Sequence, residues 1–388
     1  MPAAVTYTAA MRRRKPKRWR GLTLLLGLTL LLSAGCVGSP PLPPHPAHPA
    51  HPAPIASRPA SSSVVDPAPT TASPTPTPTL VDPDTLPARL ELGLVRRNGY
   101  LLLPARLEGQ RLGLMMIDTG ASLTVLSSGV VGRLGLASQG RGRTVGVGGY
   151  EPFDYYPVRG LTVGGTAPPS PPTSSGTLDP APIWLGLPST RAAGLELRRF
   201  GHGLSVSLAG IVAYPDLAAA PFTLDPARQR LTVYHPRQFR PPPDTTRHRL
   251  HHHRRLPVLP ATLHLQGRRL PIDLIVDYGA DNALTLPASL LDDYPDLAAV
   301  PALGRGATHG VGGQVASTRT WLRRVDLLGL TLQDLPVHFE TPPPGLGLAR
   351  PGRPLGRIGN ALLQHFQLTF HPSHGYLYAR WQPQAPPD

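Results

Sequence analysis

The sequence predicts an all-β protein made of two homologous halves. Its folded part reads as short apolar segments of β character, separated by glycine- and proline-containing turns, with few segments of helical period. Several blocks of the first half recur in the same order in the second half. Because short strands with turn signals between them are typical of closed all-β folds, we expect two homologous closed β-barrels related by pseudo-twofold symmetry within one chain.

The first recurring block is a hairpin that ends in an aspartate. Residues 100–121 read as two apolar strands joined by a Glu-Gly turn, and the second strand runs into Asp118 in an Asp-Thr-Gly-Ala motif. Residues 256–280 repeat this order with a Gln-Gly turn and reach Asp277 in an Asp-Tyr-Gly-Ala motif. A short glycine-containing turn between apolar runs indicates a hairpin. Each half therefore begins with a hairpin that presents an aspartate at its end.

Two later blocks recur as well. Residues 144–149 and 308–313 both end in Gly-Val-Gly-Gly, and residues 210–226 match residues 356–372. Three matching blocks in the same order make chance agreement a poor explanation. The two halves are called the first and the second repeat below.

On these motifs the sequence resembles the retropepsin-like aspartic proteases, over nearly all of residues 90–381. The Asp-Thr-Gly-Ala-Ser run that starts at Asp118 matches the catalytic signature of that family, and residues 358–363 resemble its later conserved stretch. Viral members assemble two identical chains to obtain two aspartates, whereas the duplication here supplies both from one chain, as in the pepsin-like branch. The resemblance implies a peptide or protein substrate, catalytic aspartates Asp118 and Asp277, and neither cofactor nor metal. We expect a monomer.

Peptide hydrolysis by water explains why two aspartates are needed. A base must take a proton from the water, and an acid must protonate the carbonyl oxygen. Two carboxylates about 3 Å apart cannot both be charged, so they share one proton and their titrations separate. Glycine allows the tight turn that presents each aspartate. The residues expected to support the pair are Thr119, Gly120, Tyr278 and Gly279. A single Asp-Thr-Gly is equally compatible with an ordinary turn, but two copies in phase favour the catalytic pair.

The Gly-Val-Gly-Gly segments match the position of the hairpins, or flaps, that close over the substrate in this family. Glycine lets a hairpin tip move and lets a peptide backbone approach it. The residues expected at the flaps and at the substrate are Gly148, Gly149, Tyr150, Gly312, Gly313 and Gln314. A plain hairpin turn is the alternative. A phosphate-binding loop is disfavoured, since no Lys-Ser/Thr pair follows and no helix is expected there.

The second motif departs from the family, which has threonine or serine where this chain has Tyr278. The hydroxyls of the family hydrogen-bond beneath the aspartates and hold them rigid, and Thr119 can still do so from one side. A phenol is much larger and needs both room and a partner when buried. Either the site has repacked around the phenol, or the two halves sit differently and activity is reduced. Ala213 also stands where the second repeat has Gly359.

The N-terminal sequence predicts a secretion signal. A basic run ending at Arg20 is followed by residues 21–34, in which leucine dominates. This length is typical of the apolar region of a signal peptide and too short to span a bilayer. Cys36, the single cysteine, ends a stretch similar to a bacterial lipobox. This resemblance implies lipidation of Cys36 and anchoring to a membrane. Val37 follows, with no aspartate there, which favours the outer membrane facing the periplasm. An unmodified cysteine is the alternative.

Composition sets the expected boundaries. Proline, alanine, serine and threonine dominate the stretch after Cys36, which cannot bury enough apolar surface to fold. The expected organisation is a signal peptide at 1–35, a lipidated, proline-rich tether at 36–87, a first aspartic protease lobe at 88–240, an interlobe linker at 241–255 and a second lobe at 256–388. A short helix is expected over 361–366 and an inserted surface loop over 168–191.

The formal charge of +15 does not indicate a nucleic-acid partner. Seven basic residues precede Cys36, and the remaining surplus is spread over loops without interleaved aromatic residues. Histidines cluster at 45–51 and 248–253 and can bind metal, but we interpret both clusters as solvated loops because no carboxylate or thiolate is interleaved. Three functions stay open: an aspartic endopeptidase, a catalytically inactive peptide-binding or scaffold lipoprotein of the same fold, and a histidine-mediated metal-binding lipoprotein.

Overall fold

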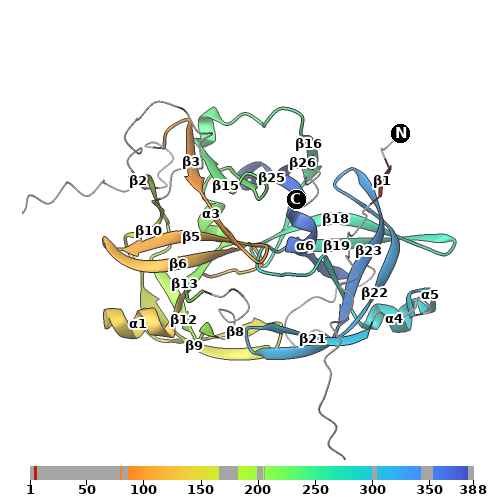
Figure 1. Cartoon of the computed structure of the whole chain (residues 1–388), viewed down its shortest axis with the longest axis horizontal. Helices are drawn as coiled ribbons and strands as arrows, with labels where there is room; N and C mark the ends of the chain where they lie inside the picture. Colours follow the sequence, from red (N-terminus) through yellow and green to blue (C-terminus); the bar gives the residue numbers. More distant parts are fainter. Residues whose placement is uncertain are drawn as a thin grey trace, which may run out of the picture. The chain divides into compact units, whose positions relative to one another are not determined.

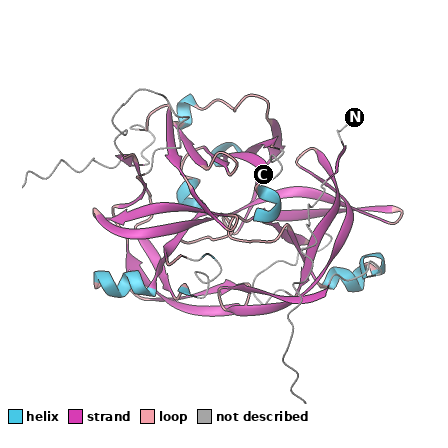
Figure 2. Cartoon of the chain, viewed as in Figure 1, coloured by secondary structure: helices cyan, strands magenta, loops and turns pink. Residues whose placement is uncertain are grey.

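The computed structural model describes residues 4–6, 79–80, 86–165, 182–198, 204, 206–298, 304–341 and 353–382. The chain divides into two units, one made of Met1–Thr8 and Thr75–Asp388 and the other of Ala9–Pro74, and all described residues belong to the first. Strands make up most of this unit and the helices are short (Figure 2). The all-β class expected from the sequence is confirmed.

An 11-stranded sheet is formed by the first repeat and the residues just before it. Its strands are, in spatial order, β2 (Thr79–Leu80), β11 (Trp184–Gly186), β10 (Leu161–Gly164), β5 (Tyr100–Leu107), β6 (Gln110–Asp118), β13 (Leu208–Ala213), β7 (Val125–Ser127), β12 (Arg191–Leu195), β9 (Gly149–Pro157) and β8 (Arg141–Gly146), with β4 (Val95–Arg97) on β5. The β5–β6 hairpin turns at Glu108 and Gly109, both at positive φ. β13 runs parallel to β6 and places Ala213 opposite Asp118.

A 9-stranded sheet is formed mainly by the second repeat. Its strands are β1 (Ala4–Thr6), β23 (Leu330–Glu340), β20 (Leu284–Pro287), β24 (Leu355–Ile358), β19 (Arg268–Val276), β18 (Leu256–Leu265), β22 (Gly313–Leu327) and β21 (Gly304–Gly310), with β17 (His251–His253) on β18. The β18–β19 hairpin corresponds to β5–β6 (Figure 1), and β24 runs parallel to β19 as β13 does to β6. β19 ends directly before Asp277.

A six-stranded sheet joins the two repeats. Its order is β16 (Thr246–Arg249), β26 (Tyr376–Trp381), β25 (Phe366–His371), β14 (Phe222–Asp225), β15 (Arg230–Tyr234) and β3 (Arg89–Gly93). At its centre, β14 of the first repeat pairs with β25 of the second, so that Thr223 lies opposite Thr369 with their Oγ1 atoms 2.6 Å apart. The neighbouring rings of Phe222 and Phe370 stack with centroids 4.6 Å apart. Matching residues of the two repeats thus meet each other here.

The helices are brief and connect strands. They are α1 (Ser128–Leu134), α3 (Tyr214–Leu217), α4 (Ser289–Asp293), α5 (Pro295–Ala298) and α6 (Asn360–Leu363), with 3₁₀ turns η1 (Pro236–Gln238) and η2 (Pro372–His374). α1 begins where the hydroxyl of Ser127 accepts from the Val130 amide, and it ends at Gly135 in the left-handed region. α6 overlaps the helix expected over 361–366 but is shorter. Within the described residues, no helix has the length and apolar character to cross a bilayer.

Two expectations about loops are wrong where the structure describes them. The histidine segment 248–253 is not a loop, because His248 lies in β16 and the other three histidines form β17. In the insertion expected over 168–191, residues 166–181 lie outside the description, but β11 is a strand and the side chain of Trp184 is buried. The signal peptide, Cys36, the tether and the histidines at 45–51 lie outside the described residues, apart from the short strands β1 and β2 and residues 86–87, of which Leu86 is buried in the core.

Candidate active site

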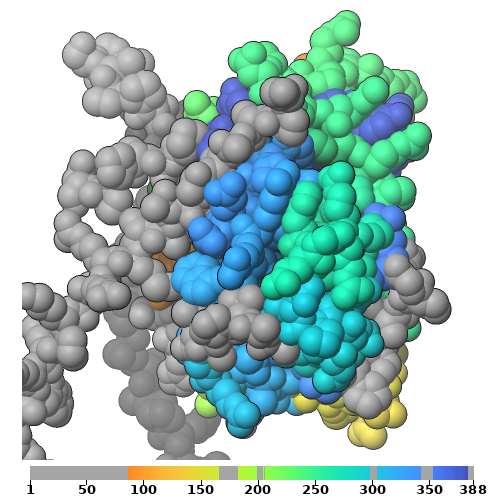
Figure 3. All heavy atoms as spheres, turned by 90° about the vertical axis from the view of Figure 1, so that its right-hand side faces the viewer, coloured from red at the N-terminus to blue at the C-terminus, as the bar shows by residue number. Residues whose placement is uncertain are grey.

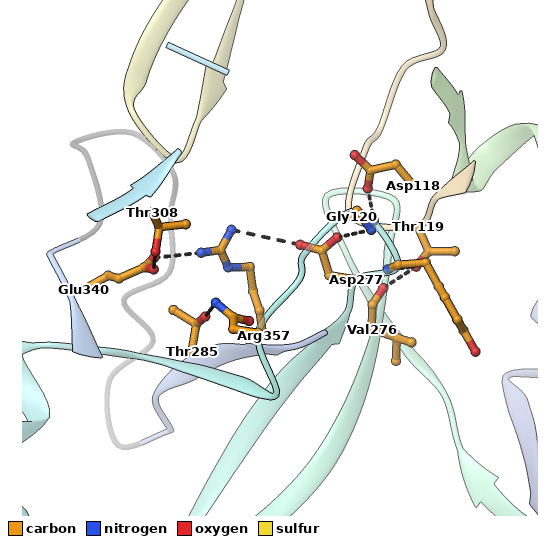
Figure 4. Close-up of polar contacts among 12 residues, drawn as sticks. Asp118, Thr119, Gly120, Val276, Asp277, Thr285, Thr308, Glu340 and Arg357 are labelled. Atoms are coloured by element: carbon orange, nitrogen blue, oxygen red, sulfur yellow. Dashed lines mark hydrogen bonds and ion pairs between the residues drawn. The ribbon is translucent and has the colours of Figure 1, made fainter. Parts of the chain in front are cut away.

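The two Asp-X-Gly motifs form matching turns. Oδ1 of Asp118 accepts a hydrogen bond from the amide of Gly120 at 2.8 Å, and Oδ1 of Asp277 accepts one from the amide of Gly279 at 2.9 Å. In both turns the backbone carbonyl of the aspartate accepts from the amide of the following alanine at 3.3 Å. The two turns therefore hold their carboxylates in the same way (Figure 4).

The structure brings the two carboxylates together. A Cβ on Gly120 would lie 2.5 Å from Cγ of Asp277, and a Cβ on Gly279 would lie 2.3 Å from Cγ of Asp118. Real side chains do not approach so closely, so each carboxylate occupies space that only the glycine of the opposite motif leaves free. The two carboxyl groups are close enough for each to shift the pKa of the other.

The surroundings of the two carboxyl groups determine which of them holds the shared proton. Burial raises the pKa of Asp118 well above its ordinary value, and the negative charge of Asp277 raises it further. Burial also raises the pKa of Asp277, but the positive charge of Arg357 opposes this shift. Asp118 is therefore the better site for a shared proton, and Asp277 is the better site for the charge.

Thr119 links the two motifs from below. Its buried hydroxyl donates to the backbone carbonyl of Val276 at 2.6 Å and accepts from the amide of Tyr278 at 3.1 Å. Both partners flank Asp277 in the chain. The geometry expected for Thr119, support of the opposite aspartate from one side, is present.

Tyr278 does not return this contact. Its ring is fully buried in the hydrophobic core, and its hydroxyl has no hydrogen-bond partner among the described residues. Burial raises the pKa of this phenol, and the charge of Asp225 raises it further. Of the two arrangements that the sequence allowed, the structure has the one in which the core accommodates the phenol. Asn360 then holds the loop, since its side-chain amide donates to the Tyr278 carbonyl at 2.7 Å.

Arg357 is a site residue that the sequence did not single out. Its Nη1 lies 3.9 Å from Oδ2 of Asp277, and its Nη2 donates to Oε2 of Glu340 at 2.7 Å. The hydroxyl of Thr308, on β21, donates to the other oxygen of Glu340, so a chain of polar contacts runs from Asp277 to the hairpin of the second Gly-Val-Gly-Gly segment (Figure 4). The signal available in the sequence was one charged residue within the apolar run Leu-Gly-Arg-Ile.

Tyr100 is a second residue that the sequence reasoning missed. The pKa of its phenol is raised by burial and by the negative charges of Asp281, Asp277 and Asp118. The charges of both carboxylates of the pair therefore act on this phenol. Tyr100 opens β5, the first strand of the hairpin that ends at Asp118.

The two expected flap tips meet each other. The amide of Gly148 donates to the Val311 carbonyl at 3.0 Å, and a Cβ on Gly148 would lie 2.2 Å from the Gly313 nitrogen. Figure 1 shows β8 and β9 meeting β21 at the lower edge of the view. Gly149 and Gly312 belong to the same contact, because a Cβ on Gly312 would lie 2.4 Å from the Gly149 oxygen.

The two weaker substrate candidates beside these tips are exposed. Tyr150 is 49% exposed, and the guanidinium of Arg143 lies 4.6 Å from its ring centroid. Gln314 is exposed as well. Neither side chain is brought to the carboxylates by a contact among the described residues. Among all the residues that the structure describes, His, Cys, Asp and Glu side chains form no group of three that would suit a metal ion.

Comparison with known proteins points in one direction. The family model described as aspartyl protease matches residues 103–184, which include Asp118, its turn and the first flap. The match does not reach Asp277. A search of curated proteins finds no match to the chain. The first repeat is therefore similar to an aspartyl protease in sequence, and the second resembles it through the geometry of its Asp-X-Gly turn.

Proposed function

We propose that the chain is an aspartic endopeptidase that hydrolyses peptide bonds with a water held between Asp118 and Asp277. One observation carries the proposal: each carboxylate lies in the space left by the glycine of the other Asp-X-Gly motif. Isolated turns at strand ends have no reason to meet in this way. The match of residues 103–184 to the aspartyl protease family supports the proposal from the sequence.

The charges of the pair suggest the order of events. Asp277 takes a proton from the water while the water oxygen attacks the peptide carbonyl carbon, and Asp118 gives its proton to the carbonyl oxygen. The resulting diol then returns a proton to Asp118, while Asp277 protonates the nitrogen and the C–N bond breaks. The pair again holds one proton. Because the two groups titrate as a unit, the roles belong to the resting state and exchange during the cycle.

The arrangement of the strands supports two lobes with pseudo-twofold symmetry as part of this proposal. The two hairpins, the parallel strands beside them and the Asp-X-Gly turns correspond one to one. The symmetry axis would pass between Thr223 and Thr369 and between the two aspartates. The lobes would span 88–240 and 256–388, with residues 241–255 between them and part of that connection in β16 and β17.

The substrate class follows from the flaps. An extended peptide offers a backbone that a hairpin edge can bind, with pockets for alternate side chains. The two glycine-rich hairpin tips, which contact each other, would close over such a peptide. Tyr100 and Glu340, which connects to β21, lie on the elements that would flank it. We propose a peptide or protein substrate and a monomeric enzyme.

An envelope location is proposed from the sequence alone. The basic and leucine-rich start would act as a signal peptide, and lipid on Cys36 would anchor the folded part through the proline-rich tether to the outer membrane, facing the periplasm. Cys36→Ser should then release the chain from membranes and abolish incorporation of labelled fatty acid. A chain that stays soluble and unlabelled without the substitution would overturn this proposal.

A second function is favoured by Tyr278. A phenol in place of the second hydroxyl removes half of the support beneath the aspartates, which fits a catalytically inactive protein that binds peptides at the same site or serves as an envelope scaffold. Hydrolysis separates the two functions, since binding requires no proton transfer.

The test is cleavage of a peptide library by the full chain from about pH 3 to about pH 8, a range that covers ordinary and raised carboxyl pKa values. Asp118→Asn and Asp277→Asn should each abolish cleavage, whereas Asp293→Asn, an exposed control, should leave it unchanged. Binding of peptides without cleavage at any pH, by a chain of normal thermal stability, would establish the inactive binding protein instead.

A further inference from the structure

The six-stranded sheet has one apolar and one polar face. Side chains alternate between the faces of a strand, and on β14 the apolar Phe222 and Leu224 point to the core while Thr223 and Asp225 share the other face. On β15, Arg230 lies opposite Asp225 and Thr232 opposite Thr223, so the polar face continues across the sheet.

A cavity of about 340 Å³ lies on this polar face. Residues of β3, β14, β15, β25 and β26 line it, together with the proline-rich segment that follows η1. That segment leads into β16, which pairs with β26, and Figure 3 shows the green part of the chain lying beside the dark blue C-terminal strands. Since a water occupies about 30 Å³ of liquid, the cavity has room for a small anion with its hydration.

Arginine dominates the lining. Five arginines face the cavity, Arg89, Arg228, Arg230, Arg240 and Arg380. Two carboxylates neutralise part of this charge: Glu91 pairs with Arg89 and with Arg230, and Asp225 pairs with Arg228 at 3.0 Å. The site therefore keeps a surplus of three positive charges.

In the described part of the chain, no carboxylate pairs with Arg240, which is exposed, or with Arg380, which is half-buried. One donor of the cavity, Nε of Arg230, is buried and has no hydrogen-bond partner among the described residues. A buried donor without an acceptor costs free energy, so its presence points to a group that supplies one. Asp225, the only acid in the lining, already accepts from Arg228, Gln367 and Gln382, which limits its repulsion of an anion.

We propose that this cavity binds a phosphate group, carried by a soluble phosphate compound or by a phospholipid headgroup. Guanidinium groups bind phosphate in a bidentate manner, and several arginines around one cavity match an anion with more than one negative charge. A single carboxylate would leave most of the positive surplus unneutralised. The proposal is independent of the chemistry at Asp118 and Asp277, because the cavity lies on the sheet that joins the repeats.

Calorimetric titration of the full chain with inorganic pyrophosphate tests the proposal. We expect saturable binding at one site, weakened about tenfold or more in Arg240→Ala and further in Arg240→Ala/Arg380→Ala. Arg240 lies outside any strand, so its variant keeps the sheet intact. Arg159→Ala/Arg323→Ala removes two exposed arginines elsewhere and should bind as the unchanged chain does. Equal binding by the cavity variants, or equal loss in the control, would overturn the proposal.

The source of the phosphate is separated by a second measurement. Flotation with phosphatidylcholine vesicles that contain phosphatidylglycerol, compared with phosphatidylcholine alone, reports binding to a lipid headgroup. Cys36→Ser is used in both cases so that an acyl anchor does not contribute. Loss of flotation in Arg240→Ala/Arg380→Ala supports a lipid source, and pyrophosphate binding without flotation supports a soluble one. Absence of both would overturn the phosphate site.

Discussion

Arg357 lies 3.9 Å from the carboxylate of Asp277, whereas the matching position beside Asp118 holds Ile211. Each residue lies in the strand that runs parallel to the strand leading to the aspartate. The two carboxylates are held by the same turns, yet the matching position of the neighbouring strand carries a guanidinium in one repeat and an aliphatic side chain in the other. This difference makes the pair electrostatically unequal and leads to the first prediction.

Arg357→Leu should move the acid limb of the pH–activity profile to higher pH. The positive charge of Arg357 lowers the pKa of Asp277 against the effect of burial, so its removal raises that pKa and delays the ionisation on which activity depends. Profiles of kcat/KM against pH measure the shift. Arg357→Lys keeps the charge and should leave the acid limb near its original place. Superimposed profiles for all three proteins would show that Arg357 does not act on the pair.

Asp118→Asn should change how stability depends on pH. The pKa of Asp118 is raised above its ordinary 3.8, so between these two values the folded chain binds more protons than the unfolded chain. The contribution of Asp118 is therefore fully present below pH 3.8 and is lost as pH rises through the raised pKa. The Tm of the variant relative to the unchanged chain should rise from acid toward neutral pH. A difference in Tm that stays constant with pH would contradict the raised pKa.

Tyr278→Phe should stabilise the fold by about 1 kcal/mol, because it keeps the ring and removes a buried hydroxyl that has no partner among the described residues. Tyr278→Thr, which restores the hydroxyl amino acid of the first motif, should destabilise it by about 3 kcal/mol, since the core loses the volume of a ring. Urea unfolding measures both. Greater stability of the threonine variant would mean that the core does not depend on the phenol.

Gly148→Ala should separate the flap tips. Its Cβ would lie 2.2 Å from the Gly313 nitrogen, and neither backbone can give way without breaking the contact. We expect kcat/KM to fall by about tenfold, consistent with misplacement of a closing element, with little change in Tm. Gly132→Ala is the control: no atom lies within 4 Å of its Cβ, and in helix α1 alanine should add about 0.5–1 kcal/mol of stability. An unchanged kcat/KM for Gly148→Ala would place the tip contact outside the reaction.

The hairpins and their aspartates were predictable because the signals are local. Alternating apolar residues, a two-residue turn ending in glycine and the Asp-X-Gly turn lie within about 20 residues of each other. The repetition then predicted that the two aspartates would meet.

The contacts of Arg357 were not predictable in the same way. Glu340 lies 17 residues before Arg357, and Thr308 lies 32 residues before Glu340. Glu340 and Arg357 come together through the register of β20, β23 and β24, and Thr308 reaches Glu340 through the pairing of β21, β22 and β23. The histidine strands were missed for another reason: segment 246–253 has no apolar alternation, and it forms strands by backbone pairing with β26 and β18.

The two repeats can carry different residues at this position, Arg357 and Ile211, only because one chain contains both of them. Two copies of one short chain would place the same residue beside both aspartates, giving two arginines or two isoleucines. When one gene encodes both repeats, the codon for this position can change in one repeat while the codon in the other repeat is kept. A peptide is itself directional, from its amino to its carboxyl end, and an unequal pair of carboxylates can distinguish the two directions in which it could lie, whereas an equal pair cannot.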